Sequence, residues 1–412
     1  MAAADVMPFA VDPKPSWKPI IVEAEQEPAS LGQDEFNASK HLGFKDPPKV
    51  YSMKDLGLPE NTGISPVAVS EPFPLFTQEA VMRMRKEVLC PEVLQNCKYS
   101  SNLAQCQLRG FANKYAPFVY DAWKSPDTLA IISKIAGIDL VTEMDLEIAH
   151  INISVKSEQE RKEEIEAFAD RAQYEADEGI AGCPWEDNKP IVDWHTDSYP
   201  FVCVTMLSDC TTMIGGETAL RTGNGDIMKV RGPQMGCAVV LQGRYIEHQA
   251  LRALGTAERI SMVTSFRPRN PIVRDDTVLT TVRPISNLPE LYNQFCEYRL
   301  EMLEERVRGQ LRLLREANGH QRHIATVKLK AFLAEQERFL AHMNREMVDD
   351  SQVVFGDIDD SHLLTPPPRR KKRSRTSMKM EGGSRSRRRS EPDLSKAHSR
   401  EFLVFLGLAA SF

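Results

Sequence analysis

Residues 191–207 read IVDWHTDSYPFVCVTML, and residues 241–269 read LQGRYIEHQALRALGTAERISMVTSFRPR. Both segments contain runs with the β-branched, alternating composition of strands. Together they carry His195, Asp197 and His248, which offer two imidazoles and one carboxylate. Alternate side chains of a strand share a face, so His195 and Asp197 can reach one ion from the same side. His248 would then have to come from a strand lying alongside.

The donor set of His195, Asp197 and His248 predicts the kind of metal. Two imidazoles and one carboxylate on one face of an octahedral ion leave the remaining positions open, as in non-haem Fe(II) oxygenases. A structural zinc site is usually closed by four ligands that include thiolates, and the sequence contains no CxxC spacing. Either histidine alone would more often be a partly buried, hydrogen-bonded side chain, so the prediction depends on the joint pattern.

A second pair of polar residues follows His248 by eleven residues. The strand-like run ERISMVTSF carries Arg259 and Ser261, which are two positions apart and therefore face the same way. A guanidinium grips a carboxylate through two parallel hydrogen bonds, and a hydroxyl adds a third donor. Beside a metal site, this pair predicts a binding site for a dicarboxylic 2-oxo acid. Taken alone, Arg259 would more often form a surface ion pair, and a serine in a strand needs no function.

The ordered set His195-Thr-Asp197, His248 and Arg259-Ile-Ser261 resembles the HxD…H…RxS pattern of the Fe(II)/2-oxoglutarate-dependent dioxygenases. The segment between the histidines also resembles the hairpin, turn and apolar strand that precede this family's distal histidine. The resemblance covers roughly residues 141–270, about a third of the chain. It implies a mainly β core with helical extensions (α+β), in which a double-stranded β-helix, a jelly-roll or cupin-like barrel, is buttressed by helices.

The same resemblance implies an activity and its cofactors. Fe(II) would be held by His195, Asp197 and His248, and 2-oxoglutarate by Arg259 and Ser261. The co-substrate would be converted to succinate and CO2 with O2 as oxidant, while an unidentified substrate is hydroxylated or desaturated. Ascorbate would support the iron. The acidic body of the chain favours a small-molecule substrate. A protein or a nucleic acid as substrate remains an alternative.

The 412-residue chain divides by pattern into four predicted regions. Residues 1–75 are rich in proline and are expected to pack on the core as an extended leader. Residues 76–275 would form the jelly-roll domain with its buttressing helices, and residues 286–350 a C-terminal helical region. Residues 360–412 are expected to be a disordered basic tail, because their lysines, arginines and serines cannot form a core.

Helix signals are clear at several positions of these regions. Thr77 and Ser125 stand where helix N-caps are expected, and Gly137 stands where a helix ends. The C-terminal helices should break at residues 318–319. Residues 157–179 are charged and helix-prone, most simply a solvated helix, with a lid over the site as the alternative.

Other polar residues could contact the substrate or serve only the fold. Residues 145–155 alternate like a strand, whose one face would carry Leu146, Ile148, His150, Asn152 and Ser154. On it, His150 and Asn152 either line the cavity or make ordinary buried hydrogen bonds. Core packing is the simpler reading for the aromatic segment that contains Arg109, Lys114 and Tyr115. Residues near the ligands that could shape the site are Trp194, Glu217, Arg221 and Arg244.

Composition limits the partners. Apolar residues make up 42% of the chain, charged residues 27%, and the net charge is −6. Residues 365–400 hold 13 Lys/Arg against 3 Asp/Glu, so the rest is acidic and no nucleic acid is expected at the core. Eight scattered cysteines, no signal-peptide pattern and no membrane-length apolar run favour an intracellular, cytoplasmic protein. The clusters RRKKR and RSRRRSEP are also compatible with a nuclear localisation signal.

Two further interpretations concern the C-terminal part of the chain. The apolar positions of its helices recur at heptad-like intervals, which allows packing on the domain itself or on a second copy in a homo-oligomer. The alternative to an enzyme is a non-catalytic barrel or scaffold that acts through these helices and the basic tail. A scaffold would usually have lost a metal ligand, so the complete set favours the enzyme.

Overall fold

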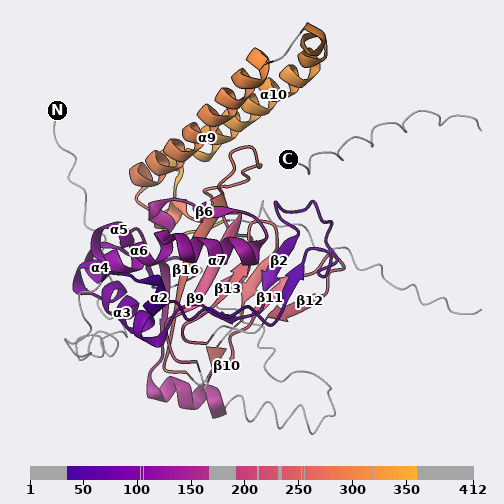
Figure 1. The fold of residues 1–412 in the computed structure, drawn as a ribbon. Coiled ribbons are helices and arrows are strands. Elements are labelled where there is room, and N and C mark those ends of the chain that lie inside the picture. Colours follow the sequence, from indigo (N-terminus) through magenta and orange to yellow (C-terminus); the bar gives the residue numbers. More distant parts are fainter. Residues whose placement is uncertain are drawn as a thin grey trace, which may run out of the picture. The chain divides into compact units, whose positions relative to one another are not determined.

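The computed structural model describes residues 35–359, apart from residues 103, 105, 167–191, 211–212, 231–233, 252, 255 and 317–318. The predicted basic tail, residues 1–34 of the leader and residues 167–179 of the charged segment therefore lie outside the described residues. Two antiparallel sheets form the centre of the described part, with short helices against one sheet and a long helical hairpin beyond it (Figure 1).

Eight strands form the centre of the two sheets, and along the chain they alternate between the sheets except that β11 and β12 are consecutive and pair with each other. The four in the large sheet are β7 (His150–Val155), β9 (Phe201–Met206), β13 (Cys237–Leu241) and β16 (Glu258–Pro268). The four in the small sheet are β8 (Val192–His195), β11 (Thr218–Arg221), β12 (Ile227–Val230) and β14 (His248–Ala250), in the spatial order β12-β11-β14-β8. This alternation is the arrangement of a double-stranded β-helix. The predicted mainly β core with helical extensions is confirmed, and the described strands stack as two separate sheets.

Further strands extend the large sheet to the order β1-β2-β13-β9-β16-β7-β5-β4. At its two ends lie β1 (Val50–Ser52) with β2 (Val67–Ser70), and β5 (Gln107–Leu108) with β4 (Lys98–Tyr99). Short strands β3 (Phe73–Pro74) and β6 (Leu140–Thr142) pair with β13 and β16. A separate pair consists of β10 (Ile214–Gly215) and β15 (Ala253–Leu254).

Strands β9 and β13 of the large sheet carry apolar residues on both faces because both faces are covered there. Along β13, Ala238 and Val240 belong to the core under the helices, whereas Val239 and Leu241 belong to a second core shared with the small sheet. Strand β9 divides in the same way, with Cys203 under the helices and Val202 between the sheets. A strand buried on both sides reads as a continuous apolar run rather than an alternating one.

Short helices cover the outer face of the large sheet (Figure 1). They are α2 (Ala38–His41), α3 (Gln78–Val88), α4 (Pro91–Asn96), α5 (Ala112–Tyr115), α6 (Pro117–Lys124) and α7 (Pro126–Ala136). Thr77 caps α3 as predicted, its hydroxyl accepting a hydrogen bond from the Ala80 amide. Gly137 ends α7 in the left-handed conformation, at a φ of 68°. Ser125 precedes α7 as expected but makes no capping hydrogen bond through its side chain.

The predicted strand at 145–155 is wrong in its first half. Residues Asp145–Glu147 form a 3₁₀ turn, η1, and the strand begins only at His150. Ala149 has a φ of 63°, and its amide donates to the hydroxyl of Thr264. Leu146 and Ile148 therefore do not share the face that His150 presents. Tertiary contacts have overridden an alternating pattern that looks extended in isolation.

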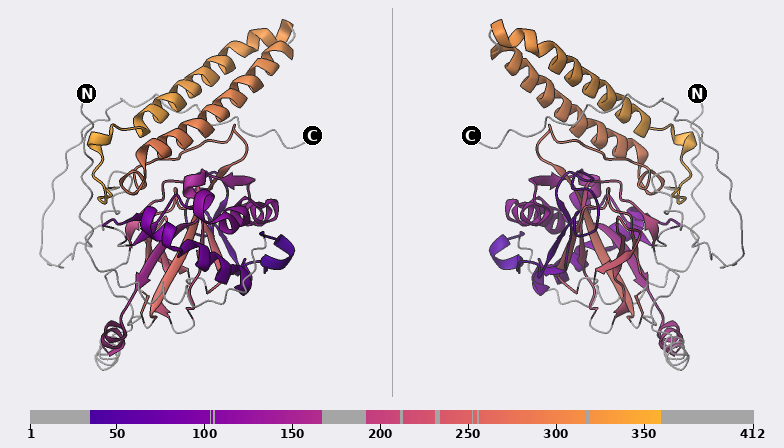
Figure 2. Two further views of the ribbon diagram at one scale, coloured as in Figure 1. Left: turned by 90° about the vertical axis from the view of Figure 1, so that its left-hand side faces the viewer. Right: turned by 90° about the vertical axis from the view of Figure 1, so that its right-hand side faces the viewer.

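The C-terminal helices are α9 (Leu288–Glu316) and α10 (Gly319–Glu346), with the break where the sequence places it. They run side by side and project away from the sheets (Figure 2). Their near ends share a core with the body of the fold, in which Phe295 and Phe339 meet Leu146 and Tyr199. Exposed apolar side chains follow the helices outward, namely Leu300, Val307, Leu311, Leu333 and Leu340. Between β7 and β8, a helix spans the described residues 158–166.

None of the helices in the described part of the chain combines the length and apolarity needed to span a bilayer.

Candidate metal centre

His195 and His248 stand opposite each other on the paired strands β8 and β14. Their ring centroids are 4.3 Å apart and the rings are tilted by 51°. Leu220 of β11 is the cross-strand neighbour of His248 and belongs to the core between the two sheets. Because cross-strand partners share a face, both imidazoles point from the small sheet toward the large one.

Asp197 completes the group from a turn rather than from the strand. The sequence places it on the same strand as His195, but β8 ends at His195 and Asp197 leads into a turn at residues 198–200. A hydrogen bond from the Asp197 amide to the Gly243 carbonyl, 3.0 Å long, holds the turn. Its Oδ1 lies 3.8 Å from His195 Nε2 and its Oδ2 lies 3.6 Å from His248 Nε2. The three side chains can each direct one donor atom to a common point, since these atoms lie within 4.8 Å of one another.

Burial and hydrogen bonding prepare this group for a cation. Asp197 Oδ2 is buried and accepts no hydrogen bond within the described residues. His248 Nδ1 lies 2.8 Å from the Ile246 carbonyl, which can only accept, so Nδ1 carries the proton and Nε2 keeps its lone pair. Burial lowers the pKa of His248 to about 4, which keeps the ring neutral at neutral pH. A carboxylate oxygen that is buried without a donor, beside the neutral ring of His248 and a second imidazole, fits a divalent metal ion.

Arg259 and Ser261 lie on the face of the large sheet that looks toward these ligands. Both are on β16, where Arg259 pairs with Ser154 and Ser261 with Asn152. The next residue on the same face, Val263, packs in the core between the two sheets. The intervening residues of β16 pack under the helices instead. Strand register therefore turns Arg259 and Ser261 into the space between the sheets.

Arg259 has no counter-ion in the described part of the chain. Its Nε is buried without a hydrogen-bond partner, and burial lowers the pKa of its guanidinium. The neighbouring Glu258 already forms an ion pair with Arg85 of α3, with 2.8 Å between Oε1 of Glu258 and Nη1 of Arg85. A buried guanidinium that no protein carboxylate neutralises is a site for an external anion.

His150 and Asn152 share the inner face of β7 but belong to a hydrogen-bonded chain. Gln107 Nε2 lies 3.4 Å from Asn152 Oδ1 and 3.3 Å from His150 Nε2. Burial, with Arg109 nearby, lowers the pKa of His150 to about 3. Arg109 is itself buried in an ion pair with Glu147, which favours packing over substrate contact for this residue.

The remaining residues of the aromatic segment lie away from the ligand group. Lys114 forms an exposed ion pair with Glu290. Tyr115 packs against the core under the helices.

Four residues flank the ligands. Arg244 donates to the hydroxyl of Thr196, between the two ligands His195 and Asp197, and to the carbonyl of Asp276. Glu217 has a buried Oε2 without a hydrogen-bond partner in the described chain. Trp194 and Arg221 stack on each other, with the guanidinium carbon 4.4 Å from the ring centroid.

Sequence reasoning missed Gly243, whose carbonyl accepts from Asp197. A glycine after an apolar strand looks like an ordinary turn residue, so no local signal marks it.

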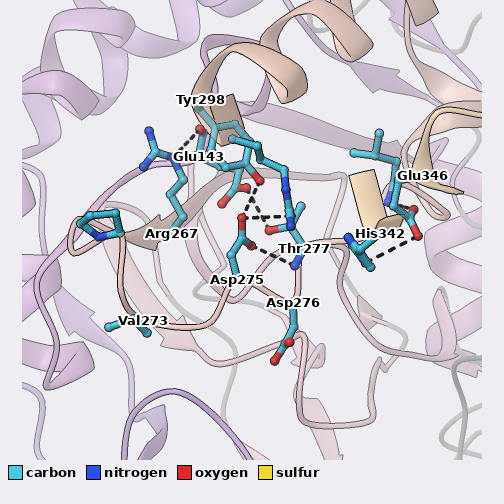
Figure 3. Close-up of polar contacts among 12 residues, drawn as sticks. Glu143, Arg267, Val273, Asp275, Asp276, Thr277, Tyr298, His342 and Glu346 are labelled. Carbon is cyan, nitrogen blue, oxygen red and sulfur yellow. Dashed lines mark hydrogen bonds and ion pairs between the residues drawn. The ribbon is translucent and has the colours of Figure 1, made fainter. Parts of the chain in front are cut away.

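A second buried polar cluster was also missed (Figure 3). Asp275 accepts hydrogen bonds from Tyr298 and Arg299 of α9, at 3.0 and 3.1 Å, and Thr277 donates to Glu143 at 3.0 Å. Burial and the neighbouring Asp275 raise the pKa of Glu143 to about 8. Burial opposes ionisation of Asp275, but Arg299 and the hydrogen bonds from Thr277 lower its pKa overall. This cluster ties α9 to the body of the fold.

Comparison with known proteins gives a distant likeness in structure. No family model matches the sequence, and no curated protein matches it. Among solved structures, a 2OG-Fe(II) oxygenase family oxidoreductase from Burkholderia pseudomallei is 12% identical, covers 42% of this chain and 75% of its own, and has a TM-score of 0.29.

Two other solved structures resemble the chain to a similar degree. A non-heme monooxygenase, the ThoJ-Ni complex, is 13% identical over 51% of this chain and 77% of its own, with a TM-score of 0.29. A full-length Neurospora crassa protein in complex with alpha-KG is 11% identical over 47% of this chain and 70% of its own, with a TM-score of 0.28. The solved structures that the chain resembles thus include members of the family that its motif resembles. Because all three scores are below 0.5, a function for this chain must rest on its own residues.

Proposed function

We propose that this protein is an Fe(II)- and 2-oxoglutarate-dependent dioxygenase, an oxidoreductase that oxidises a small molecule. His195, Asp197 and His248 would hold the iron, and Arg259 with Ser261 would hold the distal carboxylate of 2-oxoglutarate. One observation carries the proposal: a three-donor group and a buried, unneutralised guanidinium face the same space between two sheets. An ion with an open side and a dicarboxylate beside it satisfy both.

The donor set fits iron by its chemistry. Two neutral imidazoles and one carboxylate bind a divalent ion and leave positions for a chelating co-substrate and O2. Bound iron would activate O2, which is the oxidant: 2-oxoglutarate and the substrate would each give up two electrons, yielding succinate, CO2 and an oxidised substrate.

The residues of the chain contribute ligation, orientation and exclusion of water. The Ile246 carbonyl fixes the tautomer of His248, and the Gly243 carbonyl fixes the turn that carries Asp197. Arg259 provides two parallel donors to a carboxylate in a buried position, where a charge-assisted pair is strongest. Beside the three donor residues, Leu220, Val202 and their neighbours form an apolar core between the two sheets.

The alternative of a non-catalytic scaffold is supported by the projecting hairpin with its exposed leucines. It does not account for this group, because a scaffold gains nothing from a buried carboxylate oxygen and a buried guanidinium nitrogen that have no hydrogen-bond partner among the described residues. Burying these polar groups without partners destabilises the fold, and bound ligands would supply the missing partners.

Succinate formation tests the proposal. The full chain is incubated with Fe(II), ascorbate and 2-oxoglutarate, first alone and then with pools of small metabolites. We expect slow succinate release without added substrate, and faster release with the correct pool. The matched control is Asp197→Ala, which should produce none. Wild-type protein that neither binds a divalent ion nor forms succinate would leave the scaffold as the better account.

A further inference from the structure

Three residues on the outer face of the small sheet lie directly next to the inner-face residues of the site. Trp194 precedes His195 on β8, Glu247 precedes His248 at the start of β14, and Arg221 follows Leu220 on β11. Alternation along a strand turns these three away from the space between the sheets. They therefore form a row behind the histidines.

Arg221 connects the other two members of this row. Its guanidinium carbon is 4.4 Å from the centre of the Trp194 ring, and its Nε is 2.7 Å from Oε2 of Glu247. The Arg221 amide also donates to the Glu247 carbonyl at 2.9 Å. Strand β14 lies between β11 and β8, so this one side chain reaches across the strand of His248 to the strand of His195.

The backbone alone holds the two histidine strands weakly. Within the described part of the chain, strand β8 spans four residues and lies at the edge of the small sheet. Its ladder with β14 pairs His248 with His195 and then shifts register before Ala250 pairs with Val192. A short edge strand with a shifted register can slide or tilt relative to its neighbour. Any such movement would change the separation of the two imidazoles.

We propose that Arg221 is a positioning residue for the metal centre. By stacking on Trp194 and pairing with Glu247, it clamps β8 against β14 from behind and fixes the distance between His195 and His248. The inference rests on the proposed function only in that the group of His195, Asp197 and His248 binds a divalent ion. Glu247 is 10% exposed and Arg221 is 25% exposed at their side chains, so their ion pair is largely shielded from solvent.

The test uses Co(II) alone as the probe, in the absence of 2-oxoglutarate and any substrate. Arg221→Met keeps the length of the side chain but removes its charge and its planar face. We expect Co(II) affinity to fall about ten- to a hundredfold, the range for losing a residue that orients metal ligands. The visible absorption spectrum of bound Co(II) should also change, because it reports the geometry of the ligands. Arg221→Lys, which can still pair with Glu247, should recover part of the affinity.

A matched control separates positioning from a general loss of stability. Arg269→Met removes an exposed arginine that pairs with Asp139 at 3.0 Å and follows β16 of the large sheet, whereas both histidine strands belong to the small sheet. It should bind Co(II) like the wild type. The thermal unfolding of the metal-free Arg221→Met variant should resemble that of this control, while only Arg221→Met loses affinity.

The outcomes are distinguishable from failure of the proposed function. If wild-type protein binds no Co(II), the metal centre itself is wrong. If the wild type binds Co(II) and Arg221→Met binds it within twofold with the same spectrum, the positioning role is wrong and the metal centre stands. Should Arg221→Met fail to fold, Trp194→Leu decides, because it removes the stacking partner alone. A tenfold weaker affinity supports the clamp, and wild-type affinity overturns it.

Discussion

The backbone of Gly243 lies directly against the carboxylate of Asp197, so that a Cβ added to Gly243 would be 1.7 Å from Oδ2. No rotation of a methyl group relieves so short a contact. The same glycine accepts the hydrogen bond from the Asp197 amide. The position of the carboxylate in this candidate metal group therefore depends on the absence of a side chain 46 residues further along the chain.

Gly243→Ala should displace the carboxylate and weaken divalent metal binding by about tenfold or more, as loss of ligand orientation does elsewhere. Isothermal titration with Co(II) measures the effect. Gly309→Ala is the matched control, because an added Cβ there meets no atom within 4 Å. Metal affinity in Gly243→Ala equal to that of Gly309→Ala would mean that Asp197 does not bind the ion in the orientation described.

Arg259→Ala should raise the apparent KM for 2-oxoglutarate far more than it disturbs metal affinity. A charge-assisted hydrogen-bonded pair contributes roughly 1.5–3 kcal/mol, so the expected rise is about ten- to a hundredfold. Succinate formation as a function of 2-oxoglutarate concentration measures it, and Co(II) titration provides the comparison. Arg269→Ala serves as the control arginine. An unchanged KM in Arg259→Ala would remove this residue from the carboxylate site.

Ser261→Ala should have a smaller effect in the same assay. A neutral hydrogen bond contributes only about 0.5–1.5 kcal/mol, which corresponds to a rise in KM of about two- to tenfold. Metal affinity should not change. A rise as large as that of Arg259→Ala would show that the serine and not the arginine dominates binding of the carboxylate.

Glu143→Gln should stabilise the fold, and more at pH 8 than at pH 5. The pKa of Glu143 is raised from 4.5 to about 8 in the folded protein. Between these values the unfolded chain releases a proton that the folded chain retains, so the free energy of unfolding falls as pH rises. Glutamine has no such proton and avoids this loss. The temperature midpoint of unfolding, measured for both proteins across this range, should diverge by several degrees toward pH 8, and parallel curves would contradict it.

The part of the site that depends on strand pattern could be predicted from the sequence. The alternation in ERISMVTSF puts Arg259 and Ser261 on one face, and β16 carries them as expected. His195 and His248 each fall on a strand, and the order of the strands brings them opposite each other. Here the local pattern and the tertiary arrangement agree, which is why the inference from one to the other succeeds.

Features that depend on contacts between distant residues could not be predicted. Ala149 adopts its positive φ although the surrounding residues alternate like a strand, and its amide is bound by Thr264, more than a hundred residues later. Asp197 reaches the ligand group from a turn held by Gly243. The hydrogen bond from Thr277 to Glu143 joins residues 134 positions apart, and Asp275 is bonded by Arg299 of α9. None of these relationships leaves a periodic signal in the chain.

Anaerobic binding of 2-oxoglutarate to the chain, with and without one equivalent of Fe(II), tests the central claim most directly. If His195, Asp197 and His248 hold an open-sided ion facing Arg259, the wild type binds one Fe(II) per chain, and the bound metal tightens 2-oxoglutarate binding. Asp197→Ala should lose the metal and this enhancement, and Arg259→Ala should bind the metal but hold 2-oxoglutarate weakly. Binding of 2-oxoglutarate that is equal in all three proteins and indifferent to iron would contradict the account.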